Sequence, residues 1–379
     1  MNPVPRRSDS GSSGGENGEG LVLVTGANGY LGRELSRRFL ADGMEVVLAV
    51  RSSTARSDVA AALGPLAERA RFVAVDLTEA EPFAAVHPAL RRRITSVVHG
   101  AAVTRFNVDR EVAALVNVEG TRHALALARS CPELESFTLV GTVYSSGLQV
   151  GRIAEEAHSD EAGFANFYEW SKWEAEQLVL AQADELPWRV LRVATVAADD
   201  DTGAVTHHNA FHETLKLCFY GLLALLPGCG DTPLYFVTRA FAVDAVRRLT
   251  DPACPGGIYH VAHDRSASIT LDQLLDIAFE EFESVDDFRK KRILRPLLAD
   301  EESFDLMVDG VTGFAGSLVT QALANVAPFA RQLYVTKDLD NSRLRSALHD
   351  YEAPDAASLV RATCHQLVAT RWGRRAAHV

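Results

Sequence analysis

The feature that most constrains the fold is a short apolar run followed at once by three spaced glycines. Residues 21–32 read Leu-Val-Leu-Val-Thr-Gly-Ala-Asn-Gly-Tyr-Leu-Gly. The run predicts a buried parallel strand, and the glycines predict a tight turn into a helix. Gly26 permits the turn, Gly29 lets phosphates approach the backbone, and Gly32 lets the helix pack closely on the strand. The free N–H groups at the start of that helix favour a bound pyrophosphate.

The rest of the chain continues the alternation of strands and helices. Apolar, β-branched runs predict further strands at 45–50, 71–75, 94–99, 136–140 and 188–193, and helical patterns occur at 31–40, 112–128 and 170–183. We therefore expect an α/β protein built on a doubly wound parallel sheet. The expected divisions are a dinucleotide-binding domain at 21–200, to which 235–265 returns, and a substrate-binding, helical C-terminal region at 201–379.

The amino-acid composition limits which classes of partner and which cellular compartment are expected. Lysine and arginine number 38 against 50 acidic residues, a net charge of -12 that argues against nucleic acid. Five scattered cysteines without metal-site spacing predict reduced thiols in the cytoplasm. Residues 1–20 are rich in Gly and Ser and lack an apolar run, so we expect a disordered tail and no signal peptide.

No segment reaches the roughly 18 apolar residues that a membrane-spanning helix needs. The most apolar stretch, 215–226, is interrupted by Lys216 and predicts a buried or pocket-lining helix, with contact at a membrane surface as the alternative. Two patterns are interpreted as incidental. His207, His208 and His212 have helical spacing but lack a further ligand for a metal, and the glycines of 310–316 predict a packing turn.

A second motif, Tyr168-Glu-Trp-Ser-Lys172, follows far along the chain. Its tyrosine and lysine are four residues apart, so they share one helical face. Such a pair also arises by chance in a buried helix. Together with the glycine turn, however, it predicts a nicotinamide dinucleotide cofactor and redox chemistry.

The end of the second strand indicates which dinucleotide is bound. Enzymes that prefer NAD usually place an acid there, whereas residues 46–53 read Val-Val-Leu-Ala-Val-Arg-Ser-Ser. Arg51, helped by Ser52 and Arg33, would bind a 2′-phosphate, which favours NADPH while leaving NADH open. The alternative is an ordinary solvated arginine. Asp76 and Leu77, after the third strand, are placed to meet the adenine.

These motifs resemble the extended short-chain dehydrogenases/reductases. The resemblance covers about 21–262 and rests on the glycine turn, the Tyr168/Lys172 pair, Thr142, His99-Gly-Ala-Ala102 and Asn117-Val-Glu-Gly-Thr121. Within that superfamily, the stretches 101–106, 140–144 and 166–179 look most like the fatty-acyl and thioester reductase branch.

The resemblance implies roles for single residues. Tyr168 would be the acid/base residue, with its pKa lowered by the Lys172 cation and the positive nicotinamide, and Thr142 would bind the substrate oxygen. Asn117 would hold a proton-relay water through its backbone, unless it is merely a polar turn or helix residue. The implied cofactor contacts are Gly26, Asn28, Gly29, Tyr30, Leu31, Gly32, Arg51, Ser52, Asp76, Leu77, Ala101, Ala102, Tyr168, Lys172, Val193 and Thr195. The chain departs from the family pattern at Gly141, where Ser is common, and at Val193, where Pro is usual.

Three functions remain open at this point. The first is an NADPH-dependent reductase of a carbonyl or an acyl thioester. A thioester substrate would be delivered on a separate carrier or on coenzyme A. The second is an epimerase-type isomerase with tightly held NAD, and the third is a non-catalytic NADP-binding sensor. The apolar stretch 203–227 favours an apolar or acyl substrate, with Phe211, Leu215, Phe219, Tyr220 and Leu222 as expected wall residues unless they only form core. A homodimer is left open, and residues after about 280 have no assigned role.

Overall fold

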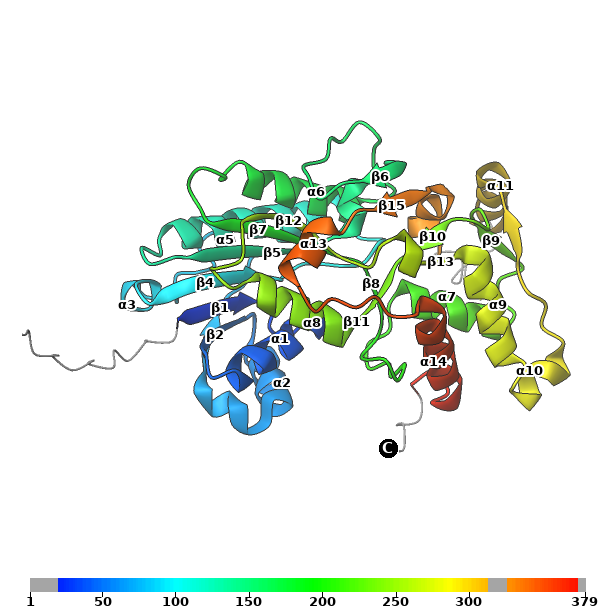
Figure 1. Ribbon diagram of the computed structural model, residues 1–379, viewed down its shortest axis with the longest axis horizontal. Coiled ribbons are helices and arrows are strands. Elements are labelled where there is room, and N and C mark those ends of the chain that lie inside the picture. The colour runs from blue at the N-terminus through cyan, green and yellow to red at the C-terminus, as the bar shows by residue number, and fades with distance from the viewer. Residues whose placement is uncertain (1–19, 313–325, 374–379) are drawn as a thin grey trace, which may run out of the picture.

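The computed structural model describes residues 20–312 and 326–373, and its centre is a seven-stranded parallel sheet (Figure 1). The strand order is β12-β7-β5-β4-β1-β2-β3. The strands are β1 (Leu21–Thr25), β2 (Glu45–Val50), β3 (Ala70–Ala74), β4 (Ile94–His99), β5 (Ser136–Thr142), β7 (Trp188–Val193) and β12 (Gly257–Val261). β1 is buried along its whole length between β2 and β4, which explains its uninterrupted apolar sequence.

The strand order reverses direction next to β1. The chain first builds outward through β2 and β3, and then crosses back to add β4, β5, β7 and β12 on the other side. In open parallel sheets, ligands bind outside the carboxyl ends of the strands at such a reversal. The glycine turn follows β1 at this edge, so the topology places it where a ligand is expected.

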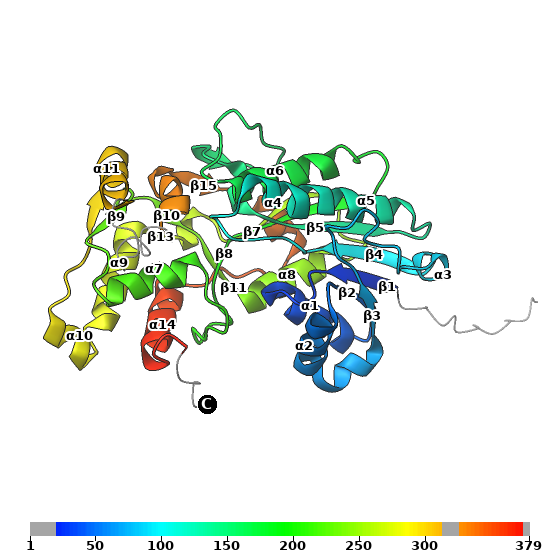
Figure 2. The same ribbon diagram turned by 180° about the vertical axis from the view of Figure 1, so that it is seen from behind.

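Helices cover both faces of the sheet (Figures 1 and 2). One face carries α1 (Tyr30–Ala41), α2 (Ser53–Leu63) and α8 (Arg239–Leu249), and the other carries α4 (Arg110–Ala113), α5 (Gly120–Arg129) and α6 (Phe167–Leu180); α3 (Pro88–Arg91) precedes β4. Each face has its own apolar core. Phe39 and Val246 lie in one core, and Ala124 and Val179 lie in the other.

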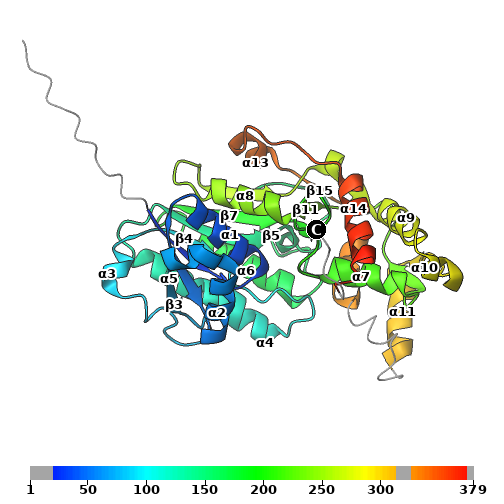
Figure 3. The same ribbon diagram turned by 90° about the horizontal axis from the view of Figure 1, so that it is seen from below.

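A third core lies beyond one end of the sheet, where the C-terminal helices gather (Figure 3). These helices are α7 (Ala210–Phe219), α9 (Leu271–Phe282), α10 (Asp286–Lys291), α11 (Glu301–Thr312) and α14 (Ala356–Ala369), with α13 (Ser342–Ala347) beside β12. Four short strand pairs connect this region: β8 (Thr195–Ala198) with β11 (Phe236–Thr238), β9 (Leu225–Pro227) with β14 (Leu297–Ala299), β10 (Pro233–Leu234) with β13 (Ile269–Thr270), and β6 (Gly151–Ile153) with β15 (Lys337–Leu339).

The predicted fold class is confirmed, with all six expected strands in one parallel sheet and β12 as an additional strand. The stretch 215–226 is not a single helix, because α7 ends at Phe219 and β9 begins at Leu225. Within residues 20–312 and 326–373, no helix is long and apolar enough to cross a membrane. The five cysteines are all free thiols.

Two sequence predictions fall wholly or partly outside the described residues. The predicted disordered tail at 1–20 does so except for Gly20. Of the second glycine group, Gly310 lies inside α11 and not in a turn, while Gly313 and Gly316 are outside the described ranges. The packing turn expected at 310–316 therefore stays a prediction for those two glycines.

Candidate active site

The glycine turn has the geometry that a bound pyrophosphate requires. Gly26 has a φ of +75°, and a Cβ there would lie 2.6 Å from the Ala101 nitrogen. A Cβ at Gly32 would lie 2.1 Å from the Gly26 oxygen, so both positions exclude a side chain. At Gly29, a Cβ would meet only the Gly26 oxygen, at 3.1 Å, and otherwise faces open space. The turn thus leaves an open approach to the N-terminus of α1, which fits a dinucleotide.

Tyr30, the first residue of α1, links this turn to the C-terminal region. Its hydroxyl donates to Asp199 Oδ1 at 2.5 Å, and the Arg239 guanidinium lies 5.0 Å from its ring centroid. Arg239 also pairs with Asp199 at 3.4 Å, and His207 stacks on the tyrosine ring at 5.0 Å. Burial and the Asp199 carboxylate raise the pKa of Tyr30. The phenol therefore stays protonated and acts as a fixed hydrogen-bond donor.

The positions predicted to bind the adenosine half lie after β2 and β3. Arg51 is exposed, and Ser52 caps α2 by accepting from the Ala55 nitrogen at 3.1 Å. Asp76 Oδ1 accepts from the Thr78 hydroxyl at 2.7 Å and from its N–H at 3.0 Å. These bonds, with help from Arg51, lower the pKa of Asp76. Leu77 is buried and would contact a Cβ added at Gly120.

Thr142 and Tyr168 bring two hydroxyl groups together. Thr142 ends β5, and Tyr168 lies in the first turn of α6, which Asn166 caps by accepting from the Glu169 nitrogen at 3.0 Å. Both side chains line the same cavity, and the Thr142 hydroxyl opposes the rise that burial causes in the pKa of Tyr168. A substrate oxygen placed between them would therefore meet two donors.

Lys172, one turn further along α6, donates from Nζ to the Val140 carbonyl at 2.9 Å. Burial lowers its pKa to about 8, while Glu176 opposes that shift. Burial also raises the pKa of Tyr168, which differs from the expected lowering by Lys172. Because burial is the main cause of this shift, the Tyr168 phenol stays protonated and can act as an acid.

Asn117 lies in a π-helical turn, Ala114–Glu119, between α4 and α5. Its side chain accepts from the Val103 nitrogen at 2.8 Å and donates to the Val103 oxygen at 3.0 Å and to Ser171 Oγ at 2.9 Å. The Asn117 carbonyl, expected to hold a water, accepts from the Thr121 hydroxyl at 2.6 Å. The asparagine thus fastens the loop after β4 to α6, and π-turns of this kind are frequent at functional sites.

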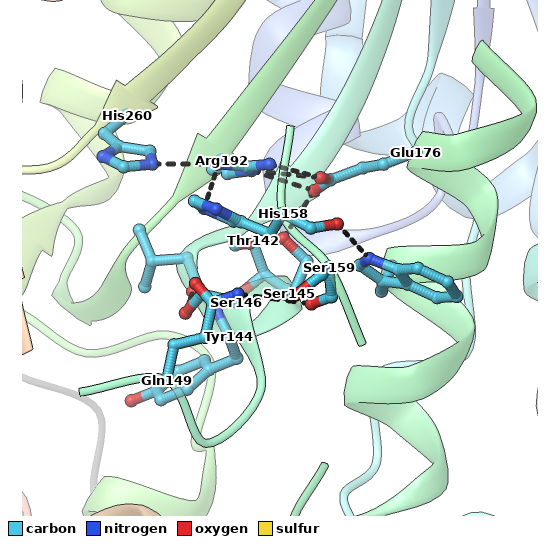
Figure 4. A network of polar contacts seen from close by, with 12 residues as sticks. Thr142, Tyr144, Ser145, Ser146, Gln149, His158, Ser159, Glu176, Arg192 and His260 are labelled. Atoms are coloured by element: carbon cyan, nitrogen blue, oxygen red, sulfur yellow. Dashed lines mark hydrogen bonds and ion pairs between the residues drawn. The ribbon is translucent and has the colours of Figure 1, made fainter. Parts of the chain in front are cut away.

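A buried polar network lies next to Thr142 (Figure 4). Arg192 donates to Glu176 at 2.8–3.3 Å and to Nε2 of both His158 (2.6 Å) and His260 (3.2 Å). Ser145 Oγ lies 2.8 Å from the Thr142 carbonyl and 2.5 Å from Glu176 Oε1. Because arginine only donates, both histidines accept with a neutral ring.

The absence of a side chain at Gly141 is explained by this network. A Cβ at Gly141 would lie 3.2 Å from Glu176 Oε1. The departure from the family pattern at this position therefore leaves the Glu176 carboxylate in place beside β5, and it preserves the hydroxyl of Thr142 one residue later.

One large cavity, about 830 Å³, brings most of the predicted site residues together. Its lining includes Gly26, Gly29, Tyr30, Leu31, Gly32, Ala102, Thr142, Tyr168, Lys172, Val193 and Thr195. The other predicted residues are not part of that lining: Asn28, Arg51, Ser52, Asp76, Leu77, Ala101 and Asn117. Apart from Asn117, these follow β1, β2, β3 and β4 at the same edge of the sheet.

The apolar wall differs in part from the prediction. Phe211 and Leu215 line the cavity, but Phe219, Tyr220 and Leu222 do not. Phe219 instead stacks on Phe288 at 5.4 Å within the third core, and Tyr220 is 39% exposed. Phe219 lies on the side of α7 that faces the third core, and Tyr220 and Leu222 follow the end of the helix.

His207 and His208 also line the cavity, whereas His212 is a structural residue. Its Nδ1 accepts from the Asn209 nitrogen at 3.0 Å, and its Nε2 donates to the Ala197 oxygen at 2.8 Å. Both ring nitrogens are therefore occupied by backbone. In the two described ranges, no group of three or more His, Cys, Asp or Glu side chains is arranged to hold a metal.

Sequence reasoning missed several residues of the cavity. Phe106 and Tyr144 lie in stretches that resemble the reductase branch but were given no role, and Phe329, Gln332 and Lys337 lie in the unassigned region after 280.

The described site thus combines a glycine turn, a hydroxyl pair and a buried lysine at the edge of a doubly wound sheet. That combination defines the extended short-chain dehydrogenase/reductase class.

Comparison with known proteins identifies the family. The model of the NAD-binding family described as male sterility protein matches residues 24–244, and the chain belongs to this family. This membership confirms the prediction of a nicotinamide dinucleotide cofactor. The chain is 28% identical over 182 residues to the NAD-dependent epimerase/dehydratase terH of Aspergillus terreus, covering 46% of this chain and 53% of that protein. It is 31% identical over 85 residues to the chloroplastic fatty acyl-CoA reductase 2 of Arabidopsis thaliana, covering 22% and 14%. The chain thus spans about half or less of these curated relatives.

Solved structures share the fold. The terminal R domain of the myxalamid PKS-NRPS pathway superposes with a TM-score of 0.75 at 22% identity, covering 94% of this chain and 92% of that one. A thiolation-reductase di-domain of an archaeal non-ribosomal peptide synthetase gives 0.70 at 17% identity, covering 94% and 77%. A UDP-galactose 4-epimerase gives 0.61 at 16%, covering 93% and 100%. At these identities the similarity extends to the fold alone.

Proposed function

We propose that this chain is an NADPH-dependent reductase of an acyl thioester or aldehyde carbonyl, with Tyr168 as the proton donor. One observation carries the proposal. Thr142 and Tyr168 line the same cavity as the glycine turn, and that cavity continues among apolar side chains. A carbonyl oxygen between the two hydroxyls would leave its carbon open to reduction from the side of the dinucleotide.

The chain's own residues bind, orient and protonate. The bound dinucleotide supplies the hydride. Thr142 and Tyr168 donate to the carbonyl oxygen, and Tyr168 transfers its proton to that oxygen as the carbonyl carbon gains the hydride. With a thioester, the resulting hemithioacetal loses the thiol as its C–S bond breaks, giving an aldehyde. With an aldehyde, the product is an alcohol.

Burial of Tyr168 favours its role as a proton donor in the reduction of a carbonyl. The raised pKa of Tyr168 keeps the phenol protonated near neutral pH, which suits a proton donor. Lys172, held against the Val140 carbonyl, would contact the nicotinamide ribose. Val193 at the end of β7 and Thr195 at the start of β8 would border the nicotinamide ring.

NADPH is proposed over NADH because no carboxylate follows β2. Arg51 is exposed at that point, where its charge also acts on the Asp76 carboxylate after β3. A 2′-phosphate there would also lie near Ser52 at the N-terminus of α2.

The proposed substrate is apolar. Deep in the cavity, buried side chains of the third core form the lining, including Leu215, Leu226, Leu271 and Leu274. An aliphatic acyl group suits such a lining better than a sugar nucleotide, whose diphosphate needs cations. The names of two similar proteins, a fatty acyl-CoA reductase and a thiolation-reductase di-domain, agree with acyl groups delivered on coenzyme A or a carrier.

Epimerization with bound NAD is the second candidate, favoured by the similarity to terH and to a UDP-galactose 4-epimerase. The experiment that separates the two mixes purified protein with NADPH, and in parallel with NAD, and adds a long-chain acyl thioester, an aliphatic aldehyde or UDP-galactose. The nicotinamide absorbance is followed, and conversion of UDP-galactose is measured by chromatography. Oxidation that needs the thioester or aldehyde and is lost in Tyr168→Phe supports the reductase. Conversion of UDP-galactose without net NADPH oxidation would refute it.

A further inference from the structure

An aromatic cluster stands directly beside the proposed proton donor. The ring of Phe106 lies 5.5 Å from that of Tyr168 and 5.8 Å from that of Tyr144, in edge-to-face arrangements. The ring of Phe106 also lies 5.7 Å from that of Phe329. All four rings line the cavity. A carbonyl held by Tyr168 would therefore lie close to Phe106, and Phe329, which contacts Phe106, lines the same cavity.

Phe329 comes from a distant part of the chain, and buried polar bonds hold it there. Gln332 Nε2 donates to the Gly147 carbonyl and to Glu169 Oε2, each at 2.9 Å. Lys337 Nζ donates to the same Gly147 carbonyl at 2.6 Å and to Ser146 Oγ at 3.0 Å. Gln332 and Lys337 are each only 8% exposed. The segment of residues 328–337 is thus attached to the loop after β5 that follows Thr142.

The same segment is attached to the start of α6. Asn166 Nδ2, at the helix cap, donates to the Pro328 carbonyl at 2.9 Å. Glu169, the neighbour of Tyr168, is wholly buried and accepts from Gln332. β15 begins at Lys337, the last residue of this segment, and pairs with β6. The two strands lie next to each other in Figure 1. Contacts at three places therefore fix Phe329 relative to Tyr168.

We propose that residues 328–337 are a part of the active site that selects the substrate, with Phe329 and Phe106 forming a wall against the carbon next to the reacting carbonyl. This proposal rests on the proposed reductase function and deepens it. The wall leaves space for a linear chain and contacts any branch at that carbon. The substrate class is accordingly an acyl group or aldehyde unbranched at its α-carbon.

The segment acts as a specificity element and not as a source of reacting groups. The side chains of Gln332 and Lys337 are hydrogen-bonded to Gly147, Ser146 and Glu169. They therefore act through the position of Phe329. Loosening the wall should consequently change which substrate is accepted more than how fast the preferred one reacts.

The test compares hexanal with 2-ethylhexanal, which has the same main chain and one α-branch. The value of kcat/KM for each aldehyde is measured with NADPH for the wild type and for Phe329→Ala. We expect the branched-to-linear ratio of kcat/KM to rise at least about tenfold in the variant, because the truncation removes the ring that the ethyl branch would meet. Most of the gain should lie in KM for the branched aldehyde.

Phe279→Ala is the matched control. Phe279 is also half-buried and packs among phenylalanines of the C-terminal region, but it lies outside the cavity lining. The ratio should stay at the wild-type value in this control. A Phe329→Ala protein that reduces hexanal while its ratio is unchanged overturns the selective wall but leaves the reductase intact. A wild type that reduces no carbonyl compound overturns the reductase, and the wall with it.

Gln332→Ala tests the attachment without touching the wall itself. It removes a donor from Gly147 and from Glu169, so Phe329 should become less well positioned. We expect the ratio to move in the same direction as in Phe329→Ala, by a smaller factor. A loss of thermal stability with no change in ratio would show that Gln332 is structural only.

Discussion

Glu176 and Arg192 form an ion pair in which both side chains are wholly inaccessible to solvent, with 2.8 Å between Oε2 and Nη2. One residue lies on α6 and the other on β7, so the pair joins the helix that carries Tyr168 to the sheet. A buried charge without its partner is far more costly than an exposed one.

Arg192→Met is accordingly expected to destabilise the protein by about 3–5 kcal/mol, because Glu176 keeps its charge in a buried site. Urea unfolding followed by circular dichroism measures this free energy. The double variant with Glu176→Leu should recover a large part of the loss, since replacing both charges removes the unpaired one. Equal losses in the single and double variants would contradict this explanation.

Tyr168→Phe should reduce kcat/KM for any substrate of the wild type by about 10²–10⁴-fold, because the proton donor is lost while the ring remains. The dissociation constant for NADPH, measured by quenching of protein fluorescence, should change little. Thr142→Val, which removes the partner hydroxyl, is the companion variant and should also lower the rate. Full activity in Tyr168→Phe would mean that another group donates the proton.

Gly32→Ala should abolish dinucleotide binding, since its Cβ would lie 2.1 Å from the Gly26 carbonyl oxygen and push the turn apart. Gly310→Ala is the control. A Cβ at Gly310 meets nothing within 4 Å, and alanine inside a helix stabilises it by about 0.5–1 kcal/mol. Isothermal titration with NADPH and thermal melting of both variants check the pair, and NADPH binding by Gly32→Ala would contradict the proposed role.

The sequence predicted the sheet and the shared helical face of Tyr168 and Lys172 because both depend on local patterns. The β1 run is buried on both faces, and Tyr168 and Lys172 share one turn of helix whatever the tertiary structure. Phe329 could not be predicted in this way. It reaches Phe106 across more than two hundred residues, and Gln332 and Lys337 fasten it through long-range bonds that leave no motif. Phe219 was misassigned because helical periodicity does not say which of two apolar surroundings a face meets.

Arg51→Ser should weaken NADPH relative to NADH. Losing a hydrogen bond to a charged phosphate costs about 1.5–3 kcal/mol, which corresponds to roughly a 10–100-fold change in the NADPH dissociation constant. NADH has no 2′-phosphate, so its dissociation constant should stay the same. Titration of both cofactors against both proteins measures the ratio. An equal effect on the two cofactors would mean that Arg51 has no contact with the 2′-phosphate.

Acid should destabilise the protein through its buried histidines. Burial lowers the pKa of His99, His158 and His260 to about 3 each, while in the unfolded chain they titrate near 6.5. The unfolded state therefore binds more protons between these values, and stability falls as pH drops below about 6.5, by up to about 1.4 kcal/mol per pH unit for each group. Glu155 and Glu169 act in the opposite sense, because burial raises the pKa of Glu155 to about 7 and also raises that of Glu169. They are outnumbered, because burial lowers the pKa of His207, His212 and His263 as well.

Melting temperatures measured from pH 8 to pH 5 would show this dependence. We expect them to change little between pH 8 and 7 and then fall steadily below about 6.5. His158→Gln should flatten the fall, since the variant has one fewer group to protonate on unfolding. His87, which is exposed, provides the control, and His87→Gln should follow the wild-type curve. A melting temperature that rises on acidification would mean that raised carboxyl pKa values, as at Glu155, outweigh the histidines.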